Sequence, residues 1–189
     1  MLKRVVQRVF RLRTDVPVHF YLAHFFAKHV LRQNRDVSWA IHFTSTVYFP
    51  DRITRGKHVF PGDSPNNFID ATNGIEIGDY TNIGPGVGLI SGNHDTIDNS
   101  IYTKHPPIRI GAFCWLGMHA VILPGVILGD FTTVAAGAVV TKSFPEGYGI
   151  LGGNPAKVIK LLDKAKCEEF RKQKGKHHFQ QMLKHKQES

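Results

Sequence analysis

A six-residue period runs through residues 110–145 and constrains the fold more than any other feature of the chain. Each block opens with an aliphatic residue and has a small or β-branched residue at its fifth position. The opening residues are Ile110, Leu116, Ile122, Leu128, Val134 and Val140, and the fifth are Cys114, Ala120, Val126, Thr132 and Ala138. This period fits a short strand followed by a corner, repeated. It predicts that both positions point inward and that the residue after the opening one turns the corner.

Repeats of this kind are typical of a parallel β-helix, whose coils bury their core only by stacking on one another. The pattern also occurs upstream, clearly at Ile77, Ile83 and Leu89 and more weakly at Ile41, Val47, Ile53 and Val59. Residues 95–109 do not fit it, and a loop of this length inside a compact domain is usually functional. We therefore predict a β-helix over residues 37–155 with an excursion loop at 95–109.

The two ends of the chain have helical patterns instead. Residues 1–36 form a basic segment. Within it, apolar and basic residues alternate at helical spacing over residues 2–13, which predicts an amphipathic helix. A second helix is predicted from apolar residues at helical spacing, namely Val18, Leu22, Phe25, Phe26, His29 and Val30. Residues 156–174 are predicted to form a C-terminal helix and residues 175–189 a basic tail. The expected fold class is all-β, a parallel β-helix with helices at both ends.

Charge is concentrated at the ends of the chain. Residues 1–35 hold eight Lys/Arg against one Asp, and residues 160–189 hold nine Lys/Arg against four acidic residues. Basic segments favour anionic partners such as membrane, nucleic acid or phosphorylated ligands. The basic amphipathic pattern of residues 2–13 can lie on an anionic membrane. The second helix can instead cover the open end of the β-helix, and this capping role is favoured, because solenoids need polar-faced caps. Aromatic and basic residues are not interleaved on the repeat faces, so nucleic acid is not an expected partner.

The cellular compartment is indicated only by what the sequence lacks. No apolar run reaches the about 18–20 residues that span a bilayer, and the basic start is not followed by a signal-peptide pattern. Two cysteines argue against a disulfide framework. Cys114 occupies an inward position and is interpreted as a small core residue. We expect a cytoplasmic protein, with peripheral membrane contact as the alternative.

The ladders, the segment SGNHD at residues 91–95 and the segment GGNPAK at residues 152–157 resemble the hexapeptide-repeat acyltransferases. More narrowly they resemble the branch of maltose/galactoside and polysaccharide O-acetyltransferases, over about residues 60–162. The resemblance implies a left-handed β-helix and a homotrimer with active sites between subunits. It also implies acetyl-CoA as the acyl donor, a saccharide as the acceptor, and an excursion loop that reaches toward the neighbouring subunit.

Acetyl transfer to a hydroxyl needs a base, donors for the developing oxyanion and two substrates held together. A neutral imidazole suits the first task near neutral pH. His94 stands where the repeat meets the loop, as the catalytic histidine does in the resembling family, so we predict it as the general base. Asp95 or Asp98 could orient its ring, although both equally fit turns. Asn66 and Asn93 are predicted on the acceptor side, with Asn93 at an inward position from which it fixes His94.

The resemblance also assigns residues to the acetyl-CoA side. The pantetheine-binding edge corresponds to Trp115, Met118 and Ala136, and the nucleotide end to Thr141, Lys142 and Lys157. Lys157 stands where the family often has Arg, so it supplies charge without a bidentate fork. Met118 stands where some members have Ser. His58, His94 and His119 are not spaced as in the zinc-binding hexapeptide-repeat carbonic anhydrases, so no metal is expected.

Three functions compete on this sequence. The first is an acetyl-CoA-dependent O-acetyltransferase that modifies a sugar hydroxyl in surface polysaccharide or lipopolysaccharide biosynthesis by direct transfer. The second is an amino-sugar N-acyltransferase, which would use the same donor. The third is a non-catalytic β-helix scaffold that uses its basic ends on membranes or partners. His94 together with Thr141 and Lys142 favours an enzyme, and the sequence leaves the acceptor open.

Overall fold

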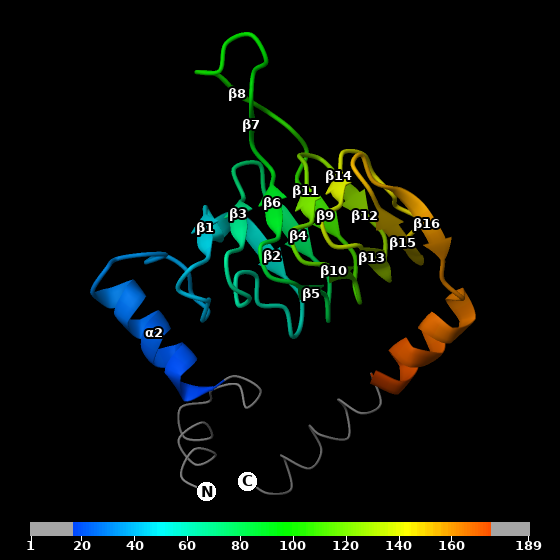
Figure 1. Ribbon diagram of the computed structural model, residues 1–189, viewed down its shortest axis with the longest axis horizontal. Helices are drawn as coiled ribbons and strands as arrows, with labels where there is room; N and C mark the ends of the chain where they lie inside the picture. Colours follow the sequence, from blue (N-terminus) through cyan, green and yellow to red (C-terminus); the bar gives the residue numbers. More distant parts are fainter. Residues whose placement is uncertain (1–16, 175–189) are drawn as a thin grey trace, which may run out of the picture.

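The computed structural model describes residues 17–174 and shows three parallel sheets wrapped around one apolar core (Figure 1). The chain visits the sheets in a fixed cyclic order, and each of the three middle coils adds one strand to each sheet. We name the sheets faces 1, 2 and 3 in the order in which the chain meets them. This arrangement confirms the predicted parallel β-helix, in which every strand is paired with the equivalent strand of the next coil.

The strands are short, as a six-residue period requires. Face 1 contains β1 (Thr46–Tyr48), β3 (Phe68–Asp70), β6 (Gly88–Ile90), β11 (Val121–Ile122) and β14 (Val139–Val140). Face 2 contains β2 (Ile53–Arg55), β4 (Ile75–Ile77), β9 (Ile108–Ile110) and β12 (Ile127–Leu128). The short 3-10 helix η1 (Pro50–Arg52) directly precedes β2. Face 3 contains β5 (Asn82–Ile83), β10 (Trp115–Leu116), β13 (Thr132–Val134) and β15 (Gly149–Gly152), and it ends on β16 (Lys157–Leu161).

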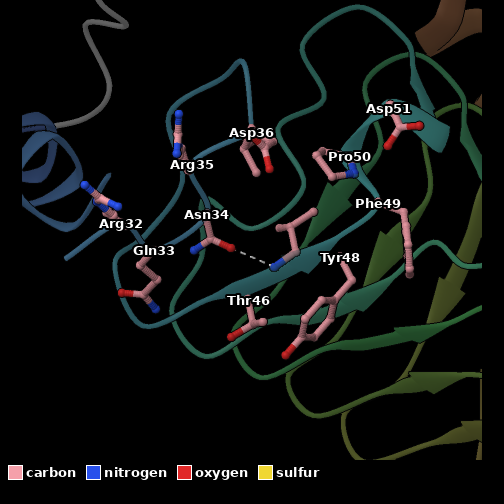
Figure 2. Close-up of a pocket in the computed structure, with 12 residues that line it drawn as sticks. Arg32, Gln33, Asn34, Arg35, Asp36, Thr46, Tyr48, Phe49, Pro50 and Asp51 are labelled. Carbon is pink, nitrogen blue, oxygen red and sulfur yellow. Dashed lines mark hydrogen bonds between the residues drawn. The ribbon is translucent and has the colours of Figure 1, made fainter. Parts of the chain in front are cut away.

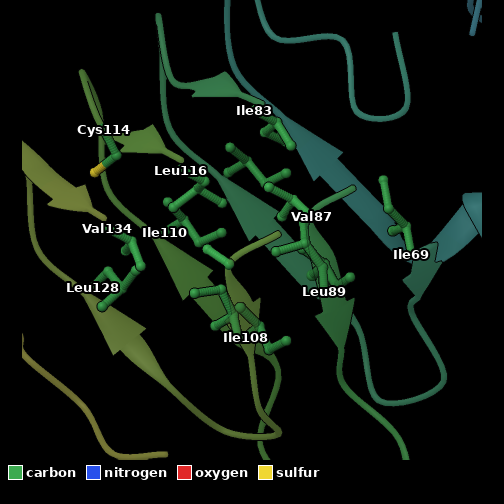
Figure 3. Close-up of a cluster of buried hydrophobic side chains, with 14 of the residues drawn as sticks. Ile69, Ile83, Val87, Leu89, Ile108, Ile110, Cys114, Leu116, Leu128 and Val134 are labelled. Carbon is green, nitrogen blue, oxygen red and sulfur yellow. The ribbon is translucent and has the colours of Figure 1, made fainter. Parts of the chain in front are cut away.

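The core consists of the positions that the six-residue period predicts to point inward. Every opening residue of the second ladder is buried, as is every fifth residue up to Ala138, and Cys114 is only 2% exposed. The strand register places equivalent aliphatic residues of successive coils next to each other, with Ile77 beside Ile110 and Ile110 beside Leu128. Figure 3 shows these side chains converging between the sheets. Because each coil covers the apolar residues of the next, the core is continuous along the β-helix.

The corners differ from the sequence prediction in one respect. The residue after the opening residue does not turn the chain; at Gly111, Gly117 and Gly129 it is where the backbone of the next coil comes so close that a Cβ would clash. A Cβ on Gly111 would lie 2.6 Å from the Asp130 backbone nitrogen. The turn itself centres on the fourth residue of the block, which has positive φ, as in Phe113 (57°) and His119 (58°).

The corner between faces 2 and 3 carries a column of stacked rings on its outside. Neighbouring rings have centroids 4.9 to 5.6 Å apart, and the column consists of His58, Tyr80, Phe113, Phe131 and Tyr148. All five residues have positive φ. Helical residues 164–174 cover this column, where the Arg171 guanidinium lies over Phe113 and Phe131 and is 2.6 Å from the Asp130 carboxylate. The column thus gives the C-terminal helix its docking site on the β-helix.

The predicted C-terminal helix over residues 156–174 is wrong in its first part. Lys157–Leu161 forms β16, which pairs antiparallel with β15, and helical residues begin at 164. The physical reason is that β15 is the last coil strand and has an open edge whose N–H and C=O groups need partners. Backbone pairing there outweighs the helical spacing of Val158, Ile159 and Leu161, whose side chains are exposed.

The N-terminal helix α2 (Val18–His29) forms where its apolar spacing predicts it. The predicted helix at residues 2–13 and the basic tail at 175–189 lie outside the described residues. Contrary to expectation, α2 does not cover the β-helix with its predicted apolar face, because Leu22, Phe25 and Phe26 are exposed and only Ala27 is buried. Within residues 17–174, no helix is long and apolar enough to cross a bilayer.

Candidate functional site

The excursion loop carries His94 away from the body of the β-helix on a small hairpin. The loop leaves face 1 after β6, at the corner between faces 1 and 2, and returns to face 2 at β9. Within it, β7 (Asn93–His94) and β8 (Tyr102–Thr103) pair antiparallel and project from the coils (Figure 1). Asn73 on the neighbouring coil donates from its amide to the carbonyl oxygens of Ser91 (2.8 Å) and Thr103 (3.3 Å). These bonds tie the base of the hairpin to the rigid coils.

Contacts from both hairpin strands hold His94. Its ring centroid lies 4.2 Å from that of Tyr102, the residue directly opposite it. Its backbone N–H donates to the Asn93 side-chain oxygen at 2.9 Å, and the Thr103 hydroxyl donates to the Asn93 carbonyl oxygen at 3.0 Å. The His94 side chain is nonetheless exposed. The imidazole is therefore supported on one side and open to a ligand.

Asn93 has the predicted effect on His94 but not the predicted location. The side chain was expected to point inward as the fifth residue of its block, and the structure shows it exposed on β7. The reason is that the regular coil ends at Gly92 and the chain turns outward into the hairpin, so the six-residue phase no longer applies. Asn93 therefore fixes His94 by hydrogen bonding to its backbone and not from within the core.

Asp95 and Asp98 organise the tip of the loop. The Asp95 carboxylate accepts the N–H groups of Ile97 (2.9 Å) and Asp98 (3.0 Å), and Asp98 accepts the Ser100 N–H and hydroxyl. The Asp98 and Ile97 N–H groups lower the pKa of Asp95, and the Ser100 hydroxyl and N–H lower the pKa of Asp98. In the part of the chain that the structure describes, neither carboxylate is bonded to the His94 ring. Both residues act as turn residues here.

Asn66 lies away from His94 in the same chain. It occupies the corner between faces 3 and 1, with positive φ (59°), and its N–H donates to the Thr44 hydroxyl at 2.9 Å. Its side chain is exposed, whereas the neighbouring Asn67 is buried and donates to the Gly84 carbonyl oxygen at 2.8 Å. The structure therefore does not bring Asn66 and His94 together within one subunit.

Four residues predicted for the acetyl-CoA side follow the edge where faces 3 and 1 meet. Trp115 is exposed on β10, and Met118 is exposed at the corner that follows. Ala136 lies on the next coil, where Gly137 donates its N–H to the Met118 carbonyl oxygen at 2.8 Å. Lys157 begins β16 directly after the cis Asn154–Pro155 peptide bond. These four residues are exposed along one edge of consecutive coils.

Thr141 and Lys142 lie on a different edge. They follow β14 at the corner between faces 1 and 2, which is the corner from which the His94 hairpin emerges on an earlier coil. Both side chains are exposed, and the Lys142 ammonium lies 5.7 Å from the Phe144 ring centroid. The residues predicted for one site are thus divided between two edges of a single chain, with His94 beside one of them.

Sequence reasoning missed the two hairpin residues that support His94. Tyr102 and Thr103 lie in the stretch that breaks the repeat, where no period assigns a partner. A signal was present, because an aromatic residue followed by Thr is typical of a strand. Among the described residues, no group of three His, Cys, Asp or Glu side chains could hold a metal ion.

Comparisons with known proteins show which sequences the repeats are similar to. Residues 107–142 match the profile of the bacterial transferase hexapeptide family (six repeats). A putative colanic acid biosynthesis acetyltransferase, WcaF of Escherichia coli, is 34% identical over 114 residues, which are 60% of this chain and 61% of the relative. The chain thus spans about three fifths of the length of that relative.

Solved structures show the same fold. A maltose O-acetyltransferase from Clostridium difficile is similar at a TM-score of 0.57, with 29% identity over 64% of each chain. A galactoside acetyltransferase in complex with coenzyme A has a TM-score of 0.61 and 21% identity, over 82% of this chain and 87% of that one. AntD, an N-acyltransferase from Bacillus cereus in complex with dTDP and 3-hydroxybutyryl-CoA, has a TM-score of 0.60 and 20% identity, over 73% and 87%. The likenesses under 25% identity show a shared fold, and the profile match, the Escherichia coli relative and the maltose O-acetyltransferase support the resemblance to the hexapeptide-repeat acyltransferases.

Proposed function

We propose that this relative of the hexapeptide-repeat acyltransferases is an acetyl-CoA-dependent O-acetyltransferase acting on a sugar hydroxyl. The observation that carries the proposal is His94, exposed on a hairpin that is anchored to the coils and backed by Tyr102. The proposed setting is surface polysaccharide or lipopolysaccharide biosynthesis. It is supported by the name of the Escherichia coli relative, a putative colanic acid biosynthesis acetyltransferase.

In this proposal the acetyl group passes directly from thioester to acceptor. The His94 imidazole takes the proton of the acceptor hydroxyl as its oxygen attacks the thioester carbonyl carbon. The resulting tetrahedral intermediate collapses, the carbon–sulfur bond breaks, and the imidazolium returns its proton to the leaving thiolate. No acyl-enzyme is needed, and the buried Cys114 is not placed to form one. The reaction is faster than in solution because the enzyme holds both substrates beside the base.

The proposed donor site uses the exposed edge of Trp115, Met118, Ala136 and Lys157, with Thr141 and Lys142. Coenzyme A carries several phosphate charges at one end, and lysine ammonium groups attract them without fixing their geometry. Trp115 offers an exposed apolar and aromatic surface for the uncharged part of the donor. Asn66, Asn93 and Asp95 are proposed on the acceptor side, where Asp95 also orders the loop.

We propose a homotrimer with its active sites between subunits. Within one chain the donor residues occupy two edges, and Trp115 is on a different face from the strand that leads to His94. A neighbouring subunit would supply the missing edge beside each His94 hairpin. We infer also that the coils turn left-handed, as the resemblance implies. Light scattering at low micromolar concentration tests the assembly, because a monomeric enzyme with full activity would contradict the shared site.

An amino-sugar N-acyltransferase is the alternative. AntD is an N-acyltransferase of similar fold, and at 20% identity that likeness concerns the fold alone. An amine attacks a thioester by the same route, so the base and the donor site are equally suitable. The identity of the acceptor atom is therefore decided by assay and not by the geometry around His94.

The test is release of free coenzyme A by the full chain from acetyl-CoA with two acceptor panels. One panel holds neutral saccharides and the other amino sugars, and mass spectrometry of the products locates the acetyl group on oxygen or nitrogen. Acceptor-dependent O-acetylation supports the proposal, and exclusive N-acetylation would replace it with the alternative. If no acceptor is modified and calorimetry detects no binding of acetyl-CoA, the chain is a scaffold and the proposal is wrong.

A further inference from the structure

Helix α2 lies at the end of the β-helix that carries the first coil (Figure 1), and several of its apolar side chains are exposed. Leu22, Phe25 and Phe26 are 65%, 61% and 54% exposed, and the apolar surface continues past the helix in Val30 and Leu31. A helix that rests on a protein core ordinarily buries such side chains. Here they form a contiguous exposed set, which we call the α2 outer face, and it requires an explanation.

The opposite side of α2 contacts the rest of the protein, so the helix cannot rotate about its axis to bury its apolar face without losing these contacts. Ala27 is buried, and the Phe20 ring lies 6.0 Å from the His42 ring. The Lys28 ammonium donates to the Val37 carbonyl oxygen at 2.6 Å. His24 is partly buried on this side, and burial is the main cause that lowers its pKa, with the charges of Lys28 and His29 adding to the effect. These contacts fix which face points outward.

Cationic side chains cluster at the C-terminal end of α2. Lys28, His29, Arg32 and Arg35 line a hollow of about 360 Å³ at the end of the helix. Arg32 and Arg35 also line a larger pocket of about 990 Å³ beside the first coil, in which Figure 2 shows them on the α2 side and Tyr48 on the opposite side. The acidic residues of this pocket are Asp36 and Asp51.

We propose that the α2 outer face is a docking surface for an anionic phospholipid bilayer. Its apolar side chains would enter the boundary between headgroups and acyl chains, and Arg32 and Arg35 would meet lipid phosphates. A large apolar set beside clustered cations is the pattern of helices that lie in the plane of a membrane, and each Lys or Arg near an anionic leaflet adds attraction. Between Pro17 and Asp36 the sequence contains no acidic residue that would oppose this attraction.

Charge complementarity favours a bilayer over a second protein. A protein partner would need an apolar groove matched in shape to Leu22, Phe25 and Phe26 and edged with acidic residues. An anionic bilayer provides both an apolar acyl-chain region and negatively charged headgroups, and it needs no surface matched in shape to the helix. This surface is remote from His94, so membrane docking can be tested independently of the proposed acetyl transfer.

The test is co-sedimentation of the full chain with sucrose-loaded vesicles. One set of vesicles is phosphatidylcholine alone, and the other contains phosphatidylglycerol as well. We expect binding to the anionic vesicles, weak or no binding to the neutral ones, and release as sodium chloride is raised, since salt screens attraction between exposed charges. Equal binding to both sets would contradict the role of the cations, and no binding to either would overturn the proposal.

Two double variants test the surface itself. Arg32→Gln with Arg35→Gln should lower the partition coefficient about 25-fold, at roughly fivefold per cation. Phe25→Ser with Phe26→Ser should lower it at least about tenfold. The matched controls lie at the opposite end of the β-helix: Ile159→Ser with Leu161→Ser, and Lys160→Gln with Lys172→Gln, all at exposed positions. Both controls should bind as the unmodified chain does.

Two outcomes would overturn the docking surface. If all variants bind equally well, the contact lies elsewhere in the chain. If the α2 variants change the oligomeric mass in light scattering while vesicle binding is absent throughout, the occupant is a second copy of the chain. Circular dichroism and calorimetric binding of acetyl-CoA are measured on every variant, so that loss of vesicle binding is not confused with loss of folding.

Discussion

The imidazole of His94 and the phenol ring of Tyr102 face each other across a two-strand hairpin, with ring centroids 4.2 Å apart and planes inclined by 40°. The two residues are directly opposed in the antiparallel register of β7 and β8. A side chain on a projecting loop normally samples several rotamers, and a ring packed against it limits that freedom. The hairpin thus presents one particular histidine in a restricted orientation, on which the first two predictions depend.

Replacing His94 by alanine should lower kcat by at least about 10²-fold, the scale expected for loss of a general base. KM for acetyl-CoA should change little, because the donor is assigned to other residues. The matched control is His105→Ala, an exposed histidine of the same loop whose ring contacts the Thr103 hydroxyl at 2.9 Å. Steady-state kinetics on the two variants separates a base from a loop residue. Equal losses in both would show that the loop, and not His94, had been damaged.

Tyr102 should act as a positioning residue for His94. Tyr102→Ala removes the ring contact and should lower kcat roughly three- to tenfold, since an aromatic pair contributes about 0.5–1.5 kcal/mol. Tyr102→Phe keeps the ring and should retain most of kcat. A merely structural role would lower thermal stability in step with activity, so melting temperature is measured alongside kinetics. If Tyr102→Phe is as impaired as Tyr102→Ala, the hydroxyl itself contributes and the positioning role is incomplete.

Lys142 should contribute to acetyl-CoA affinity and not to the chemical step. Its exposed ammonium remains near the Phe144 ring, 5.7 Å from the centroid, at the corner that also bears Thr141. Lys142→Met should raise KM for acetyl-CoA about tenfold, consistent with loss of one charge-assisted contact. The variant Lys160→Met on β16 serves as the matched control and should leave KM unchanged. Equal effects in the two variants would point to general charge attraction instead of a site.

Much of the fold follows from residue spacing. A period of six with aliphatic and small residues in two positions has few physical solutions, and the buried residues are those that it selects. The C-terminal helix illustrates what spacing cannot predict, because Val158, Ile159 and Leu161 have helical spacing yet form β16. Their conformation is decided by the unpaired edge of β15, which exists only once the coils have stacked. Local pattern and tertiary pairing compete there, and the pairing prevails.

The candidate residues can be named from the sequence, whereas the side-chain contacts that they make cannot. His94 is found from its position at the end of the repeat, whereas its partners Tyr102 and Asn93 depend on the hairpin register. The role of Asp95 changes for the same reason, since the fold of the loop commits its carboxylate to the N–H groups of Ile97 and Asp98. Side-chain partners in a loop outside the repeat are set by contacts that no period encodes.

Gly111 should be intolerant of any side chain. A Cβ on Gly111 would lie 2.6 Å from the Asp130 nitrogen and 2.7 Å from the Gly129 carbonyl carbon, both backbone atoms. Gly111→Ala should therefore destabilise the protein by about 2 kcal/mol or more, as overpacking does, and lower the melting temperature measured by calorimetry. Gly137→Asn is the matched control, because no atom lies within 4 Å of its Cβ position and Asn tolerates its φ of 69°.

The two cysteines should differ sharply in reactivity. Cys114 is 2% exposed, and its thiol donates weakly to the Gly129 carbonyl oxygen at 3.3 Å. Burial raises its pKa to about 11, because the core disfavours the thiolate. Since only the thiolate is nucleophilic, at pH 8 about one Cys114 thiol in 10³ would be ionised even before access is considered. Cys167 is half-buried, and its pKa is raised as well, mainly by burial.

Iodoacetamide treatment of the native chain at pH 8 should therefore add one label, at Cys167, and treatment in denaturant should add two. Peptide mass spectrometry gives the site and the rate of each reaction. Raising the pH from 8 to 9 should increase labelling of Cys167, while Cys114 stays unlabelled because its reagent access still depends on opening of the coils. Cys167→Ser leaves Cys114 as the single thiol and serves as the control, and it should not be labelled in the native state. Rapid native labelling of Cys114 would mean that the second ladder opens far more readily than its continuous core allows.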